Sequence, residues 1–100
     1  MPPGFEWDDD KAAANERKHG ITFAEAVTVF IDPMAIIIPD PDHSDDEDRE
    51  IILGYSDRGR LLIVSHTSRP PNLRIISARR PDPHERKQIE KRLAEGWTHE

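Results

Sequence analysis

Histidine and arginine side chains near the ends of two neighbouring expected strands are the groups in this sequence best suited to acid–base and phosphate chemistry. His66 comes near the end of a β-like run over 60–67, where side chains project into the rim of a sheet. Arg74 and Arg79 lie in the next run, and Arg80 follows it directly. Histidine moves protons near neutral pH, and the guanidinium group matches the oxygens of a phosphate. The sequence therefore offers a proton-transfer group close to fixed positive charge.

These residue types are sufficient to cleave RNA without a metal ion. The reaction needs a base for the 2′-hydroxyl proton, an acid for the leaving oxygen and positive charge for the transition state. His66, Glu85 or Lys18 could move the protons, while arginines could stabilise the charge. We therefore predict a catalytic set of His66, Arg74, Arg79 and Glu85 that uses no cofactor and no metal ion.

A structural role for the same residues remains open at this point. A lone histidine at a strand end is often partly buried and hydrogen-bonded in the core. An arginine on a strand often pairs with a carboxylate or lays its aliphatic stem over the sheet. The predicted mechanism thus depends on one geometric expectation: that His66, Arg74 and Arg79 converge on a patch that a phosphodiester can reach.

Length and composition limit the class of protein. One hundred residues form one ordinary domain, so we expect a single domain over residues 1–100 and no cleft between domains. The sequence has no cysteine, which excludes disulfides and thiolate metal sites. Its apolar runs are far shorter than the roughly 20 residues that span a membrane, and we see no signal peptide. We expect a cytoplasmic protein with no membrane partner.

The net charge of −6 is concentrated in one segment. From Asp40 to Glu50, seven acids stand against one base, whereas from Arg58 to Arg92 ten bases stand against three acids. Such an asymmetry indicates a possible polyanionic partner, although a basic segment is more often an ordinary solvated surface. The acidic segment does not fit a calcium loop, because Asp45 would occupy the position that needs glycine, and the histidines lack zinc spacing. We expect the acidic segment to be a solvated loop.

Two helices are expected in the N-terminal third. The alanine-rich stretch over 11–19 follows three acids and is followed by Gly20, the charge pattern and terminal glycine of a helix. Thr22 and Glu25 form a capping box for a second helix, and Asp32-Pro33 ends it, because the residue before proline avoids helical angles.

Strands and a last helix follow. Runs rich in β-branched residues and separated by turn residues predict strands over 35–38, 50–56, 60–67 and 72–79. Asp57-Arg58-Gly59 is typical of a hairpin loop, and Asp82 with Glu85 predicts the capped start of a C-terminal helix. The expected fold is α+β, with two N-terminal helices, a four-stranded and mainly antiparallel sheet, and a C-terminal helix.

Strict alternation along these strands assigns side chains to faces. It places Arg74 with Ala78 on one face of the last strand, and Arg79 with Ile75 on the other. One arginine is therefore expected on each side of the sheet.

The ordered set of motifs resembles the BrnT family, also called DUF497, from Phe5 to about Arg92. The N-terminal motifs are Phe5-Glu6-Trp7-Asp8, Lys11, Asn15, Lys18-His19-Gly20 and Phe23-x-Glu25-Ala26. The later ones, in the same order, are Asp32-Pro33, Asp40-Pro41-Asp42-His43-Ser44, Glu50, Ile52-Leu53-Gly54, Gly59-Arg60-Leu61-Leu62, His66-Thr67 and Arg74-Ile75-Ile76-Ser77-Ala78-Arg79.

The resemblance implies a RelE-like fold and a ribonuclease that arrests growth by cutting RNA. It also implies a BrnA-type antitoxin from the same operon, which binds the toxin in a complex of two toxin and two antitoxin chains. Operator DNA would be contacted only through that antitoxin.

Matching by motif position also suggests an RNA-binding set. Trp7, Lys11, Lys18 and His19 come from the N-terminal motifs, and Arg80 joins them on its charge. Trp7 could stack on a base, although an aromatic residue beside a first helix is more often part of the core.

Two other classes of function stay open. One is a non-catalytic, toxin-like module that only binds a protein partner, such as a DNA-binding antitoxin. The other is a nucleic-acid binder without cleavage, which ranks last because the sequence has no helix-turn-helix signal.

Overall fold

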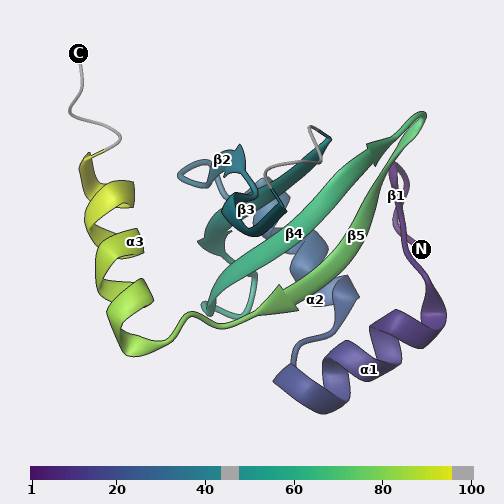
Figure 1. Cartoon of the computed structure of the whole chain (residues 1–100), viewed down its shortest axis with the longest axis horizontal. Coiled ribbons are helices and arrows are strands. Elements are labelled where there is room, and N and C mark those ends of the chain that lie inside the picture. Colours follow the sequence, from purple (N-terminus) through teal and green to yellow (C-terminus); the bar gives the residue numbers. More distant parts are fainter. Residues whose placement is uncertain (44–47, 96–100) are drawn as a thin grey trace.

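The chain folds around one five-stranded sheet, in a computed structural model that describes residues 1–43 and 48–95 (Figure 1). Part of the acidic segment, with Asp45, and the tail from residue 96 lie outside the described residues. The elements in chain order are β1 (Phe5–Glu6), α1 (Asp9–His19), α2 (Phe23–Thr28), the 3₁₀ helix η1 (Val29–Ile31), β2 (Ile36–Pro39), the 3₁₀ helix η2 (Pro41–His43), β3 (Arg49–Tyr55), β4 (Leu61–Arg69), β5 (Asn72–Arg79) and α3 (Pro83–Glu95).

The α+β class and the three helices are confirmed, but the expectation of four strands is wrong. The sheet order is β1-β5-β4-β3-β2, and β1 pairs in parallel with β5 through Phe5 opposite Leu73 and Glu6 opposite Arg74. The other three pairings are antiparallel, as expected. A strand of two residues has no alternation to read, which is why the sequence did not predict β1.

The helix ends follow the capping chemistry that the sequence indicates. The Asp8 carboxylate accepts hydrogen bonds from the backbone N–H groups of Asp10 and Lys11, so α1 begins two residues before the expected start. Gly20 ends α1 in the left-handed region at φ 70°. Asp82 and Glu85 each accept from the other's backbone N–H, a complete capping box for α3.

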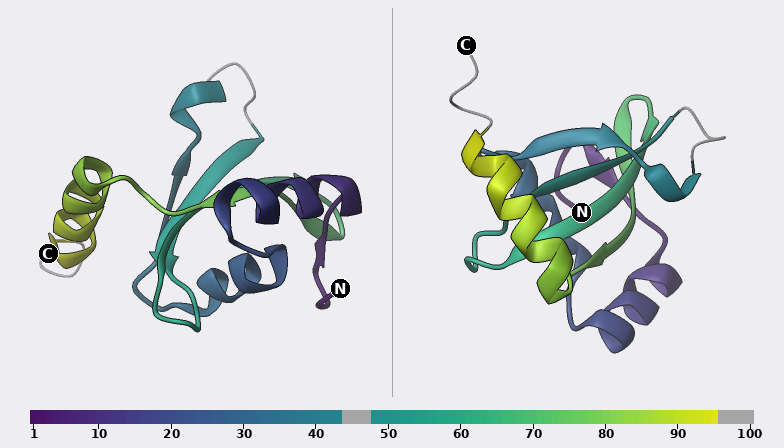
Figure 2. Two further views of the ribbon diagram at one scale, coloured as in Figure 1. Left: turned by 90° about the horizontal axis from the view of Figure 1, so that it is seen from below. Right: turned by 60° about the vertical axis from the view of Figure 1, so that its left-hand side comes forward.

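The two faces of the sheet carry separate apolar clusters. The side chains of Ile52, Leu62 and Val64 pack against α2, with Phe23 and Ala26 among their partners. On the other face, Leu53, Leu61 and Ile63 pack with two residues of α3, Ile89 and Leu93. Accordingly α3 stands apart from α1 and α2 in Figure 1 and in the left-hand view of Figure 2. Within the described residues, no helix is both long and apolar enough to cross a membrane.

A β-bulge in β5 breaks the alternation that the sequence pattern assumes. Ser65 lies opposite Ser77, but the next residue of β4, His66, lies opposite Ile75, so Ile76 is an extra residue in β5. Ile75 and Ala78 consequently share the α2 face, where both are buried. The expectation of one arginine on each side is therefore wrong.

The register on the other face follows from the same bulge. Arg74 lies opposite Thr67 and Arg79 opposite Ile63. Because directly opposed residues share a face, and Thr67 and Ile63 are four apart on β4, both arginines lie on the α3 side.

Candidate functional site

A groove of about 410 Å³ lies on the α3 side of the sheet. Its floor is formed by β3, β4 and β5, and its walls by α3 and η2. The charged and polar residues among those that line it are Asp40, Asp42, His43, Arg49, Ser65, Ser77, Arg79, Glu85 and Gln88. The groove therefore combines two guanidinium groups, an imidazole and two hydroxyls above an apolar floor.

Asp40 is the most buried charged group of the groove. One carboxylate oxygen accepts from the Asp42 backbone N–H at 2.9 Å, and the other lies 3.3 Å from the Ser65 hydroxyl, 3.3 Å from His43 Nδ1 and 3.5 Å from Arg49 Nε. Burial raises the pKa of the Asp40 carboxyl, but the Asp42 N–H and the charges of His43 and Arg49 outweigh it and lower that pKa. Asp40 is thus an ionised carboxylate fixed from several sides.

Arg79 and Glu85 form a bidentate ion pair at the end of β5. The two terminal nitrogens of Arg79 donate to the two oxygens of Glu85 at 2.8 and 2.9 Å. The Arg79 hydrogen bonds, together with the Asp82 N–H, lower the pKa of Glu85 to about 2. A guanidinium has five N–H donors, so Arg79 keeps donors for a second anion while Glu85 is bound.

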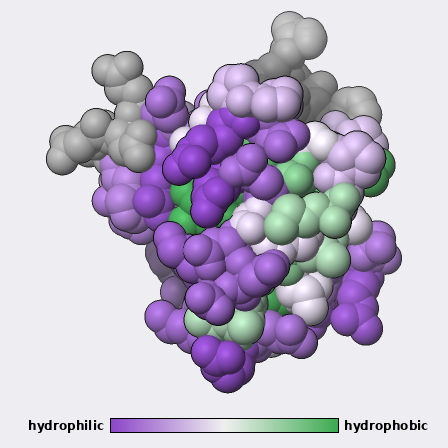
Figure 3. All heavy atoms as spheres, turned by 90° about the vertical axis from the view of Figure 1, so that its right-hand side faces the viewer, coloured by the Kyte–Doolittle hydropathy of each residue, from purple (hydrophilic) through white to green (hydrophobic). Residues whose placement is uncertain are grey.

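A second hollow, of about 220 Å³, shares the lining residue Ser77 with the groove. It is lined by Lys11, Lys18 and His19 of α1, and by Ser77, which lines both hollows. Three of the five residues predicted to bind RNA are therefore brought together. Burial, followed by the charges of Lys18 and Arg79, lowers the pKa of His19. The side of the molecule where β1 and α1 lie presents mostly hydrophilic residues around a smaller apolar patch (Figure 3).

His66 lies on the opposite face of the sheet from the groove. It is 1% exposed, and its ring packs edge-on against Phe30 with centroids 5.0 Å apart. Its Nδ1 is 3.4 Å from the Val64 carbonyl oxygen, and its Nε2 is 3.5 Å from Glu50 Oε1. Burial lowers the pKa of His66, so the folded state favours the neutral ring. The expected convergence of His66 with the arginines is not found.

Arg74, Arg80 and Trp7 are also placed apart from the groove lining. Arg74 donates to Glu6 of β1 at 2.8 Å, and Arg80 is exposed beyond the end of β5. Trp7 packs edge-on against Phe23, with ring centroids 5.9 Å apart, which supports the core interpretation of this aromatic residue. Of the predicted catalytic set, Arg79 and Glu85 lie in the groove, whereas His66 and Arg74 do not line it.

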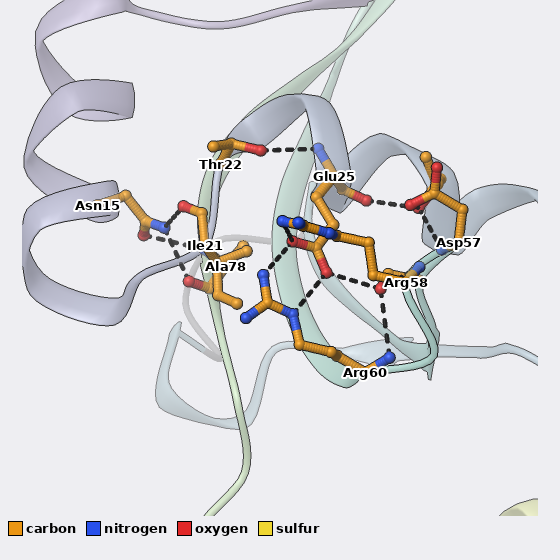
Figure 4. Close-up of polar contacts among 10 residues, drawn as sticks. Asn15, Ile21, Thr22, Glu25, Asp57, Arg58, Arg60 and Ala78 are labelled. Carbon is orange, nitrogen blue, oxygen red and sulfur yellow. Dashed lines mark hydrogen bonds and ion pairs between the residues drawn. The ribbon is translucent and has the colours of Figure 1, made fainter.

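A buried ion-pair network ties the β3–β4 hairpin to α2 (Figure 4). Both oxygens of Glu25 accept from Arg60, and one also accepts from the Ser56 hydroxyl. The Arg60 hydrogen bonds are the largest cause of the lowered pKa of Glu25. The sequence analysis recognised Glu25 only as a capping residue. The network is fully paired within the hairpin and α2, so it supports the fold rather than a reaction.

The sequence analysis did not assign a role in the site to Asp40, His43 or Arg49. They lie in or beside the acidic segment, which was interpreted as a solvated loop. The available signal was the spacing: a histidine three residues after an aspartate, and six residues before Arg49, where β3 begins. In the described parts of the chain, no three histidine, aspartate or glutamate residues are grouped so as to hold a metal ion.

Two comparisons with known proteins give matches, one to a protein family and one to a solved structure. A family model described as the ribonuclease toxin BrnT of type II toxin–antitoxin systems matches residues 7–85. A solved structure, the ribonuclease toxin BrnT of Brucella abortus, is 23% identical and has a TM-score of 0.62, covering 78% of this chain and 95% of its own. At that identity the match supports the fold alone. No curated protein matches the chain.

Proposed function

The chain belongs to the BrnT family of ribonuclease toxins of type II toxin–antitoxin systems, and from this premise we propose that it cleaves RNA in the groove beside Arg79, without a metal ion. The observation that carries the proposal is the path from the hollow at α1, with Lys11 and Lys18, through the shared lining residue Ser77 to the groove with Arg79. A single strand of RNA laid along it would meet Lys11 and Lys18 first and the groove next. Affinity would come from these cations, and chemistry from the groove.

Arg79 is the proposed contact to the scissile phosphate. Its side chain is fixed by Glu85, so its remaining donors are held in place before substrate arrives. A preorganised donor of this kind stabilises the charge that develops on phosphorus by roughly 3 kcal/mol. Glu85 is then a positioning residue for Arg79. The proposal does not depend on His66 or Arg74, which lie outside the groove lining.

The biological setting follows from the family. We propose that RNA cleavage inhibits translation and growth in the cytoplasm, and that a BrnA-like antitoxin neutralises the toxin in a complex of two chains of each. Operator DNA would be bound by the antitoxin and not by this chain.

The direct test is incubation of the purified chain with single-stranded RNA in the presence of EDTA. Cleavage should persist, and Arg79→Ala should lower it by about 10² to 10³-fold. Arg79→Lys should recover little, because the ammonium cannot reproduce the fork. Arg58→Ala is the matched control, since the Arg58 side chain is 68% exposed on the β3–β4 hairpin and does not line the groove. Intact RNA with the unaltered chain would overturn the proposal.

A second candidate, a non-catalytic module that binds only the antitoxin, has one observation in its favour. Both groove arginines already have carboxylate partners, Arg49 with Asp40 and Arg79 with Glu85. If those pairs never open to a phosphate, the chain would bind its antitoxin and leave RNA uncut. The same incubation separates the two candidates.

A further inference from the structure

We propose that His43 is the general base of the cleavage reaction and that Asp40 is the positioning residue that orients it. The inference rests on the proposed ribonuclease function and names the proton acceptor at its site. Neither residue is among the groups that the sequence suggested for proton transfer, which were His66, Glu85 and Lys18.

The His43 ring presents different surroundings to its two nitrogens. Nδ1 lies 3.3 Å from Asp40 Oδ2, whereas the side chain as a whole is 47% exposed and lines the groove. A carboxylate beside Nδ1 holds the proton on that nitrogen and leaves Nε2 with its lone pair available. Such an arrangement is what an imidazole base needs: one nitrogen oriented by an anion and the other available to substrate.

Asp40 is suited to orient the ring because it cannot easily move. Its side chain is 7% exposed, and the backbone N–H of Asp42, the Ser65 hydroxyl and Arg49 hold its two oxygens. The hydroxyl comes from β4 and the guanidinium from β3, so the carboxylate is anchored to the sheet. The direction of the His43 ring is thereby tied to the strands that form the groove floor.

His43 shares the groove with both arginines. Arg49 of β3 contacts the same Asp40 oxygen as His43 does, and Arg79 lines the same groove from β5, with β4 between the two strands. A phosphodiester bound to Arg79 would thus lie in the same hollow as the imidazole. Base and charge-stabilising group are brought together here, as they are not around His66.

The other titratable groups that line the groove are less suited to accept the proton. Glu85 has both oxygens engaged by Arg79, and this pairing lowers the pKa of Glu85 to about 2, which makes it a weak base at neutral pH. Asp40 is fully partnered. Asp42 is exposed at the groove, where a negative charge repels the phosphate.

The reaction balances without any further reactant. His43 Nε2 takes the proton of the 2′-hydroxyl as its oxygen forms a bond to phosphorus, and the bond from phosphorus to the 5′-oxygen breaks. The leaving 5′-oxygen takes a proton from water, and His43 returns its proton to the solvent. The products are a 2′,3′-cyclic phosphate on one fragment and a 5′-hydroxyl on the other.

The first test measures single-turnover cleavage of a short single-stranded RNA by the full chain. His43→Gln should lower the rate by about 10² to 10⁴-fold, the usual value of general-base catalysis. His84→Gln is the matched control, because His84 is exposed on α3 and does not line the groove; its rate should equal that of the unaltered chain. Added imidazole should partly restore cleavage by His43→Ala, since a small base can occupy the vacated space.

The second test separates orientation from structural support by Asp40. Asp40→Asn should slow cleavage when His43 is present and have no further effect in the His43→Ala background. A purely structural role for Asp40 predicts the same loss in both backgrounds. Melting curves of all variants identify any that fail to fold, and imidazole rescue of His43→Ala remains informative because the rescued protein must be folded.

The outcomes distinguish this inference from the function on which it rests. If the unaltered chain leaves RNA intact, the ribonuclease proposal fails. If it cleaves RNA and His43→Gln cleaves equally fast, the proposal stands and His43 is not the base. Fragments that end in a 3′-phosphate from the outset, without a cyclic intermediate, would also overturn the inference, because they exclude attack by the 2′-hydroxyl.

Discussion

Asn15 provides the most quantitative test of how this fold is held together. Its side chain is buried between α1 and β5, where Nδ2 donates to the carbonyl oxygens of Ala78 at 2.8 Å and Ile21 at 3.0 Å, and Oδ1 accepts from the Ala78 N–H at 3.1 Å (Figure 4). The pairing of β1 with β5 ends at Arg74. Beyond Arg74, the Asn15 carboxamide takes the place of a neighbouring strand, because it hydrogen-bonds both the N–H and the carbonyl oxygen of Ala78 at the edge of β5.

The expected cost of Asn15→Ala follows from these contacts. Three hydrogen bonds at about 1 kcal/mol each give a loss of about 3 kcal/mol, because the backbone groups of Ala78 and Ile21 lose a partner in a buried place. Alanine is the better helix former and returns roughly 0.5 kcal/mol. The free energy of unfolding should therefore fall by about 2.5 kcal/mol, equivalent to a melting temperature lower by about 10 to 20 °C for a chain of this size.

Urea denaturation of the purified variant, followed by circular dichroism, measures this loss. Asn72→Ala is the matched control, since the Asn72 side chain makes one hydrogen bond, to Glu6 at 3.2 Å, and is only half-buried. Its loss should stay below about 1 kcal/mol. If the free energy of unfolding of Asn15→Ala lies within about 0.5 kcal/mol of that of the unaltered chain, the reasoning is refuted. The three hydrogen bonds would then be no more stable than hydrogen bonds from the same backbone groups to water.

Three further predictions concern pH, packing and the groove. Burial lowers the pKa of His66 from its usual 6.5, so as the pH falls below 6.5 the unfolded state gains a proton before the folded state does, and the free energy of unfolding should fall. His66→Gln should flatten this pH dependence in melting curves recorded at several pH values. An unchanged pH dependence in the variant would contradict the prediction. Gly54→Ala would place a Cβ 2.7 Å from the Cβ of Ala35, which is too close for two carbon atoms. The free energy of unfolding, measured by urea titration, should fall by about 1 to 3 kcal/mol. An unchanged value would mean that the backbone moves to remove this contact at no cost. Arg79→Ala removes the cation proposed to contact the phosphate, so RNA should bind less tightly, and the slope of log affinity against log salt should become shallower by about 0.7; an unchanged slope would mean that Arg79 does not contact phosphate.

Local chemistry explains why the helices and four of the strands could be predicted. Each of the three α-helices starts at a side chain that accepts backbone N–H groups in the structure, and those residues are recognisable from type and spacing alone. The strand Asn72–Arg79 agrees with its expected limits at both ends. In each case the determining interaction is made within a few residues of the chain, where a sequence pattern contains it.

Interactions between distant segments account for what could not be predicted. The two-residue strand β1 exists because Phe5 and Glu6 pair with residues near position 73. Asp40 is buried because β3 and β4 supply a guanidinium and a hydroxyl to it, so a segment that is acidic by composition contributes a fixed carboxylate to the groove. Composition predicts the environment of a segment on average, whereas the site depends on one residue, Asp40, that is buried although its segment is acidic.

The bulge at Ile76 is the exception on which the groove depends. In a strictly alternating β5, Arg79 would share a face with Ile75, and both would lie either in the α2 core or in the groove. A charged guanidinium in that core would need a buried partner, and an isoleucine in the groove would leave the core unfilled. One extra residue allows Ile75 and Ala78 to face the core while Ser77 and Arg79 face the groove. β5 therefore contributes side chains to the α2 core on one face and to the groove on the other because its register shifts once. Arg79, the residue proposed to bind phosphate, reaches the groove only through that shift.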